Sequence, residues 1–341
     1  MQKKSFFKRL MGSMAARLFI ILVVMVIATM VLSSGVLDGE PASALFKKGF
    51  MSVNNLRQIF FNLVIQCVMM CGISCILIGG NIDLSVAGQA TLSTMIFAWL
   101  CAKTPLPWPV AVIIVLVIAA CFGLVNTFLV TKLKFPAFIA TIGMASVYKG
   151  LCSVITSGYN IQINRVGFTN LAKGSLFGIF PATFIFAVVL MIVCQFVLSK
   201  TRFGRSVFMA GGNPGASRLA GININKTTCI LFVINSIMAA IGGLLWTSQM
   251  KLASPTSIIT DAPDMTVISA AILGGVAFTG GSGNLAGPFI ALLLLNVLDN
   301  MLTVIGVQSY WNIVAQGLLL AVALIFDYVS AERRRKALLA A

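Results

Sequence analysis

The 341-residue chain contains no histidine, and charged residues make up only 9% of it. The lack of histidine excludes imidazole-based metal sites and general bases. An ordinary soluble domain is about 25% charged because its surface must face water. With 59% hydrophobic residues, this chain cannot cover a water-facing surface of its size, so lipid must cover most of it. The few scattered acids form no cluster suited to catalysis, and we predict a membrane protein without catalytic residues or a metal site.

The chain also lacks a Walker A loop, since no G-x-x-x-x-G-K-[ST] segment occurs in it. Its eight cysteines form no CxxC pair and lie within apolar segments. Small buried hydrophobes are therefore favoured over metal or disulfide chemistry. We expect this chain to bind no cofactor, so energy for any pumping must come from another chain or from an ion gradient.

Apolar runs of about 17–25 residues, the length that crosses a bilayer, recur along the chain. They predict an all-α polytopic bundle of about ten transmembrane helices, forming a single membrane domain over residues 1–341. A signal peptide at the N-terminus is the alternative to a retained first span. The predicted spans are residues 18–35, 56–79, 84–102, 109–131, 136–156, 181–199, 227–249, 265–281, 285–304 and 313–330.

The net charge of +16 is concentrated in short basic clusters, above all in residues 1–17, 200–226 and 331–341. Clusters between apolar runs follow the positive-inside rule. A nucleic-acid-binding protein would need a soluble basic surface instead, so we expect membrane lipid and no nucleic acid as a partner. We predict that both termini and the 200–226 loop are cytoplasmic, and that residues 36–55 and 157–180 face outward.

A glycine pair and an acidic residue lie between two predicted spans, in Gly-Gly-Asn-Ile-Asp-Leu-Ser at 79–85. Gly79 and Gly80 allow a tight reversal, because glycine tolerates positive φ. We expect Asp83 to cap the helix that begins near Ser85, since its charge suits the positive end of that helix. A direct role of Asp83 in substrate binding or gating is the alternative. A second glycine-rich segment, residues 264–287, favours close helix approach or a broken helix.

The basic 200–226 loop contains the signals of a short helix. Asn213 is a good N-cap residue, Pro214 fits the first helical position, and Gly221 can end the helix in a left-handed conformation. The predicted helix, residues 214–220, is too short to be stable alone in water.

Such a helix needs a partner, and it presents Leu219 and Ile222 beside Arg218, a mixed surface suited to docking in a groove. An interfacial helix without a protein partner is the alternative. The candidate docking residues are Asn213, Pro214, Ala216, Arg218, Leu219, Ala220, Gly221 and Ile222.

Polar side chains inside the predicted spans form another candidate set. Such groups tend to face a bundle interior or a water-filled path, and helix-to-helix hydrogen bonding is the alternative. Asn296, Asp299 and Asn300 share one helical face at spacings of three and four. The candidate translocation-path residues are Asn62, Gln66, Asn235, Asn296, Asp299 and Asn300.

Taken together, these segments resemble the ribose-type permeases of bacterial ABC importers, a branch that also serves other monosaccharides and the autoinducer-2 signal. The resemblance covers about residues 56–330. Asn81 departs from the family pattern as an extra residue in the first turn, and Asp264 stands where the family commonly has glutamate. The matching segments are 79–85, Thr-Arg-Phe-Gly-Arg at 201–205, Gly-Gly-Asn-Pro-Gly-Ala-Ser-Arg-Leu-Ala-Gly-Ile-Asn at 211–223, Leu-Gly-Gly at 273–275 and Gly-Gly-Ser-Gly at 280–283.

The resemblance implies a permease subunit in the bacterial cytoplasmic (inner) membrane. Two permeases, as a homodimer or a heterodimer, would form the pore, and each would dock a cytoplasmic ABC ATPase through residues 211–222. ATP and Mg would bind to that ATPase. An extracytoplasmic sugar-binding protein would deliver a monosaccharide or a similar small polyhydroxylated solute. The alternative is a secondary transporter that works without ATP.

Overall fold

The computed structural model describes residues 14–34, 49–172, 174–176, 178–256, 258 and 263–308, with isolated residues between 311 and 325. Within this part of the chain, seven helices are long and apolar enough to cross a membrane. They confirm the prediction of a multi-pass helical protein. These helices are α2 (Met14–Ser33), α3 (Val53–Ile78), α5 (Trp108–Thr127) with its π-helical extension η4 (Phe128–Lys132), α6 (Ala137–Thr156), α8 (Thr183–Lys200), α11 (Ile224–Met250) and α14 (Ala286–Val304).

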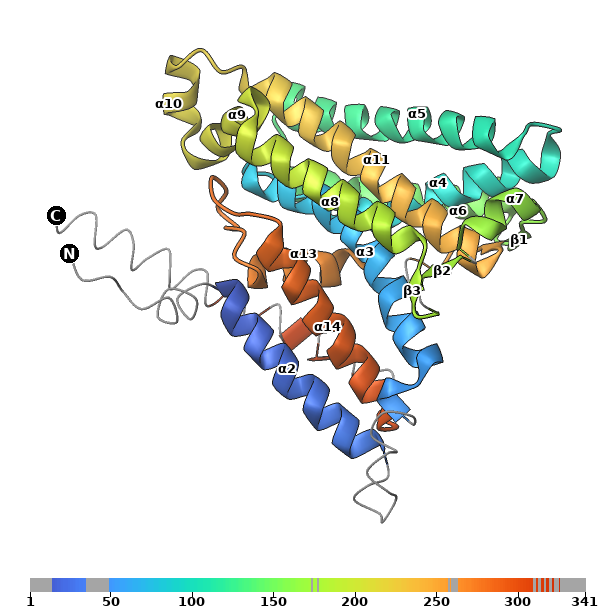
Figure 1. Ribbon diagram of the computed structural model, residues 1–341. Helices are drawn as coiled ribbons and strands as arrows, with labels where there is room; N and C mark the ends of the chain where they lie inside the picture. The colour runs from blue at the N-terminus through green and yellow to red at the C-terminus, as the bar shows by residue number, and fades with distance from the viewer. Residues whose placement is uncertain are drawn as a thin grey trace, which may run out of the picture.

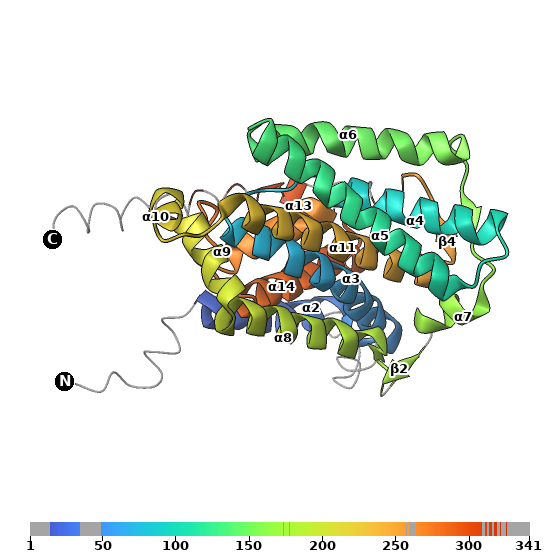
Figure 2. The ribbon, with the colours of Figure 1, turned by 90° about the horizontal axis from the view of Figure 1, so that it is seen from above.

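The bundle is built around α3, whose residues from Leu63 to Ile78 are nearly all buried. Helices α8, α11 and α14 pack around it, which suits a helix that is apolar on nearly every side from Leu63 onward. Figure 2 shows α3 and α11 in the middle of the bundle, with α6 at one edge and α8 at the other. The outer helices expose large apolar side chains, such as Ile113 at 61% and Phe196 at 59%. These outer faces suit contact with lipid.

The predicted number of about ten spans is not reproduced among the described residues. Helix α4 (Val86–Lys103) occupies the predicted span 84–102 and is mostly buried. It is less apolar than the other long helices, because it carries the buried polar residues Gln89, Thr91, Ser93 and Thr94. The predicted span 313–330 lies almost entirely outside the described residues.

The predicted span 265–281 is wrong. Helix α13 (Pro263–Leu273) has 11 residues, about 16 Å at 1.5 Å per residue, whereas the bilayer core is about 30 Å thick. It ends in a reversal at Gly274 and Gly275, where Gly275 has φ of +94°. The chain then runs through an irregular segment to α14, so the broken helix expected for this region is confirmed.

Short elements cover the two ends of the bundle. At one end, β1 (Ile161–Gln162) pairs with β4 (Leu252–Ala253), and β2 (Ser175–Leu176) pairs with β3 (Phe180–Pro181), both antiparallel. Apart from α9 and α10, the other short elements of the described chain are η3 (Gly49–Met51), α7 (Val166–Thr169) and η5 (Asn170–Ala172). At the opposite end from the strands lie α9 (Arg202–Gly212) and α10 (Pro214–Leu219) (Figure 1).

Candidate functional site

Helix α10 forms as the sequence predicts. The side chain of Asn213 accepts a hydrogen bond from the backbone N–H of Ala216 at 3.0 Å, which makes it the N-cap. Pro214 occupies the first turn, and Gly221 follows the helix with φ of +78°. Because an isolated helix of six residues is unstable, these end contacts and the packing on α9 must hold it in place.

One side of α10 faces inward and the other faces solvent. Ser217 is buried and donates to the carbonyl of Asn213 at 2.8 Å. Leu219 is 92% exposed, an unusual position for a large apolar side chain. Of the candidate docking residues, Ile222 is half-buried, and the exposed ones are Asn213, Pro214, Ala216, Arg218, Leu219, Ala220 and Gly221.

Helix α9 was not predicted, because the basic segment before Asn213 was interpreted as a loop. The hydroxyl of Thr201 accepts a hydrogen bond from the N–H of Gly204 at 3.1 Å and caps the start of the helix. Val207 and Ala210 are buried on its inner side, whereas Arg202 and Arg205 are exposed. A threonine cap followed by this amphipathic spacing was the signal available in the sequence.

Three glycine pairs from distant parts of the chain meet at the end of α9. We call this contact the glycine junction, formed by Gly79–Gly80 at the end of α3, Gly211–Gly212 at the end of α9, and Gly280–Gly281 before α14. The N–H of Gly281 donates to the carbonyl of Ile78 at 2.8 Å. A Cβ on Gly280 would lie 2.7 Å from the Cα of Gly80, and a Cβ on Gly281 would lie 2.7 Å from the N of Gly212. The backbones touch without side chains between them. A displacement of α9 would therefore also displace the end of α3 and the segment before α14.

The two glycine reversals that follow α3 and α13 have the same local structure. The N–H of Asn81 donates to the carbonyl of Ile76, and that of Val276 donates to the carbonyl of Ala271, at 3.0 Å in each case. These six-to-one bonds close a Schellman motif around a glycine with positive φ. The ends of α10 and α14 have the same bond, from the N–H of Ile222 to the carbonyl of Ser217 and from that of Val307 to the carbonyl of Leu302, so the motif is a common helix ending in this chain.

Asp83 lies at the start of α4 and binds an amide there as expected, but it is not the N-cap residue of that helix. The N-cap residue of α4 is Ser85, which makes no side-chain capping bond. The carboxylate of Asp83 accepts hydrogen bonds from the backbone N–H of Ser85 at 2.8 Å and from the hydroxyl of Ser85. The side chain is only 1% exposed. A buried carboxylate requires several donors, and these come from more than one helix.

The second oxygen of Asp83 connects three helices. It accepts from the side-chain amides of Asn235 on α11 at 2.9 Å, Gln89 on α4 at 3.3 Å and Asn126 on α5 at 3.4 Å. We call these residues, with Ser85, the Asp83 cluster. Asn235 was predicted for the translocation path, but its amide belongs to this cluster and is fully buried.

The other predicted path residues lie on α3 and α14. Asn296 donates to Gln66 at 2.6 Å, and Asn300 exchanges two hydrogen bonds with Asn55 at 2.7 and 2.8 Å. The amide of Asn62 accepts from Gln58 at 3.3 Å, within α3. The carbonyl of Asp299 accepts from Thr303 at 3.0 Å, within α14. The bonds of Asn296 and Asn300 join α14 to α3. Exposure of the predicted path residues to a solute stays a prediction.

Comparison with known proteins gives consistent matches. The family described as "Branched-chain amino acid transport system / permease component" matches residues 55–323. The L-arabinose transport system permease protein AraH of Escherichia coli strain K12 is 31% identical over 294 residues, which cover 86% of this chain and 88% of that protein. The ribose import permease proteins RbsC of Haemophilus influenzae and Bacillus subtilis are both 30% identical, covering 82% and 81% of this chain and 86% and 84% of their own lengths. No solved structure matches the chain with significance.

Proposed function

The chain belongs to the ABC-transporter permease family, in its ribose-type sugar branch, and on this basis we propose that it forms the membrane pore of an ATP-driven monosaccharide importer. It is a multi-pass transport permease and not an enzyme. The relatives named for L-arabinose and ribose support a small polyhydroxylated solute as the cargo. In this proposal the protein resides in the bacterial inner membrane, with both termini cytoplasmic.

The observation that carries the ATP-driven part of the proposal is the exposed α10 above the glycine junction. A leucine that is 92% exposed next to the exposed Arg218 suits insertion into a groove of a cytoplasmic ATPase. Full burial of a leucine side chain contributes about 1.5–3 kcal/mol. ATP and Mg bind to the ATPase in this proposal, and the permease binds no nucleotide.

The glycine junction supports a direct mechanical connection between ATPase and pore. Movement of α10 is transmitted through α9 to the ends of α3 and to the segment before α14, because backbone touches backbone there. The Asp83 cluster holds α4, α5 and α11 together near the same end. We propose that these helices move as a unit when ATP binding and hydrolysis alternate the pore between outward and inward access.

The remaining partners follow from the same family assignment. A second permease, identical or related, would complete the pore. An extracytoplasmic sugar-binding protein would dock on the end that carries the β1–β4 and β2–β3 pairs, opposite α10 (Figure 1).

Purification of the chain from native membranes in mild detergent, followed by mass spectrometry of the bound proteins, tests this proposal. We expect an ATPase with Walker motifs and a sugar-binding protein. A variant with Leu219→Asp should lose the ATPase and keep the second permease. A chain that purifies alone and transports sugar in liposomes without ATP would support a secondary transporter instead.

A further inference from the structure

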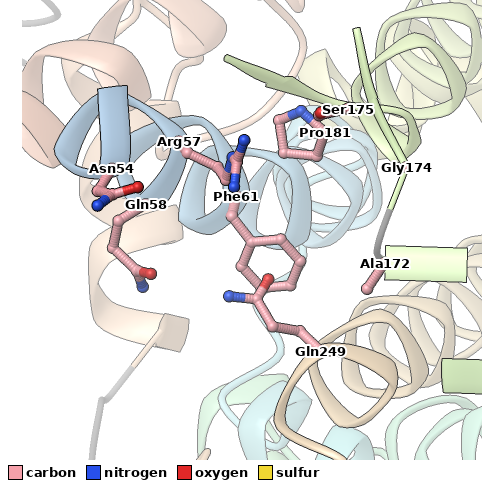
Figure 3. A pocket seen from close by; sticks show the side chains of 9 residues that line it. All are labelled: Asn54, Arg57, Gln58, Phe61, Ala172, Gly174, Ser175, Pro181 and Gln249. Carbon is pink, nitrogen blue, oxygen red and sulfur yellow. The ribbon is translucent and has the colours of Figure 1, made fainter. Parts of the chain in front are cut away.

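A cavity of about 290 Å³ lies at the end of the bundle opposite α10. It opens between the start of α3, the β2–β3 segment and the end of α11 (Figure 3). Small-molecule sites are usually clefts of roughly 300–1,000 Å³, so this cavity suits a small solute. Its lining residues are Asn54, Arg57, Gln58, Phe61, Ala172, Gly174, Ser175, Pro181 and Gln249.

The lining combines side-chain amides with an aromatic ring. Figure 3 shows the amides of Gln58 and Gln249 facing the same space, with the ring of Phe61 beside Gln249. Phe61 is 2% exposed and forms a fixed apolar wall. Arg57 donates to the carbonyl of Gly178 at 2.8 Å, which ties the β2–β3 segment to α3 at the side of the cavity.

This chemistry suits a neutral polyol better than a charged amino acid. Each hydroxyl group of a sugar both donates and accepts, and an amide side chain offers both functions. A zwitterionic amino acid would require a carboxylate for its ammonium group, and none of the described residues that line the cavity carries one.

A row of polar side chains continues from the cavity into the bundle. Asn54, Gln58, Asn62 and Gln66 follow one another at a spacing of four, so they lie along one face of α3. Asn62 and Gln66 are half-buried inside a membrane-crossing helix. Amides at this depth are unfavourable against lipid and mark contact with protein or water.

We propose that the cavity is the outer receiving site for the sugar, where Gln58 and Gln249 hydrogen-bond its hydroxyl groups beside the buried ring of Phe61. The polar row on α3 then leads the solute inward. This assignment rests on the proposed importer function and adds residues that the sequence analysis did not select.

The test uses the complete importer, with ATPase and binding protein, reconstituted in proteoliposomes. The double variant Gln58→Leu/Gln249→Leu nearly keeps side-chain size and removes both side-chain amides, and with them every hydrogen bond that the two residues could make to a solute. Uptake of radiolabelled L-arabinose and D-ribose is measured together with ATP hydrolysis. The control is Gln162→Leu, an exposed residue of β1 at the same end that does not line the cavity.

We expect the sugar transported per ATP hydrolysed to fall about ten-fold in the double variant, as the loss of hydrogen bonds to a solute predicts. Stimulation of ATP hydrolysis by the binding protein should persist in the double variant. The control Gln162→Leu should transport as much sugar per ATP as the unaltered protein. An unchanged sugar-to-ATP ratio in the double variant would overturn the receiving site and leave the importer function standing. Uptake by the unaltered chain without ATP would instead contradict the importer function.

Discussion

The glycine junction makes a sharp prediction for the substitution Gly211→Ala. The new Cβ would overlap the carbonyl oxygen of Ile78 and lie 2.7 Å from the backbone N of Gly281. Both neighbours are backbone atoms, so neither can move aside by rotating a side chain. The hydrogen bond between Gly281 and Ile78, 2.8 Å long in the unaltered protein, would have to lengthen or break.

The expected loss follows from these two effects. Overpacking of a close contact costs about 1–3 kcal/mol, and loss of a hydrogen bond costs about 0.5–1.5 kcal/mol. The melting temperature in detergent should therefore fall by several degrees. Because the junction connects α9 to α3, the sugar transported per ATP should fall as well, even in the protein that remains folded.

Gly215→Ala in α10 is the matched control. A Cβ at that position would meet only the side-chain oxygen of Asn213, at 3.4 Å, an ordinary contact. Alanine also favours the helix over glycine by roughly 0.5–1 kcal/mol. Thermal unfolding and reconstituted uptake are measured for both variants. Equal stability and equal coupling of Gly211→Ala and Gly215→Ala would refute the role of the junction.

The other predictions concern single contacts. Asp83→Asn should destabilise the folded protein by about 1–3 kcal/mol in thermal unfolding, because an amide has one acceptor oxygen where the carboxylate accepts from three helices; an unchanged melting temperature would contradict the cluster. Leu219→Ala should leave the melting temperature unchanged, since the side chain is 92% exposed, and should weaken ATPase binding about ten-fold or more in a titration; full affinity would exclude Leu219 from the contact. Asn55→Ala and Asn300→Ala should each lower stability by about 0.6 kcal/mol or more, and the double variant should lose little beyond either single one, whereas additive losses would show that the pair does not interact.

The sequence predicts much of this fold because membrane helices depend mainly on apolar length. The long apolar runs predict the first and last residues of α2, α3, α5 and α14 to within a few residues. Helix α10 was predicted to within one residue, because its start at Asn213 and its end before Gly221 depend on local hydrogen bonding and backbone conformation. Both signals are contained in a few consecutive residues.

The remaining features depend on contacts between distant segments. The role of Asp83 could not be predicted, because its donors come from α4, α5 and α11, and no local pattern pairs them. Helix α13 was predicted too long, because an apolar run continues beyond the reversal at Gly274. The cavity between Gln58 and Gln249 requires two helix ends to meet at the same place, which hydropathy does not reveal.

The most direct test of the central claim is ATP-dependent uptake by the purified complex. Proteoliposomes containing the permease, its co-purified ATPase and the binding protein are loaded with ATP and Mg, then given radiolabelled L-arabinose or D-ribose outside. We predict that sugar accumulates against its gradient only when ATP is present and the binding protein is added. Uptake of the same extent without ATP would contradict the account.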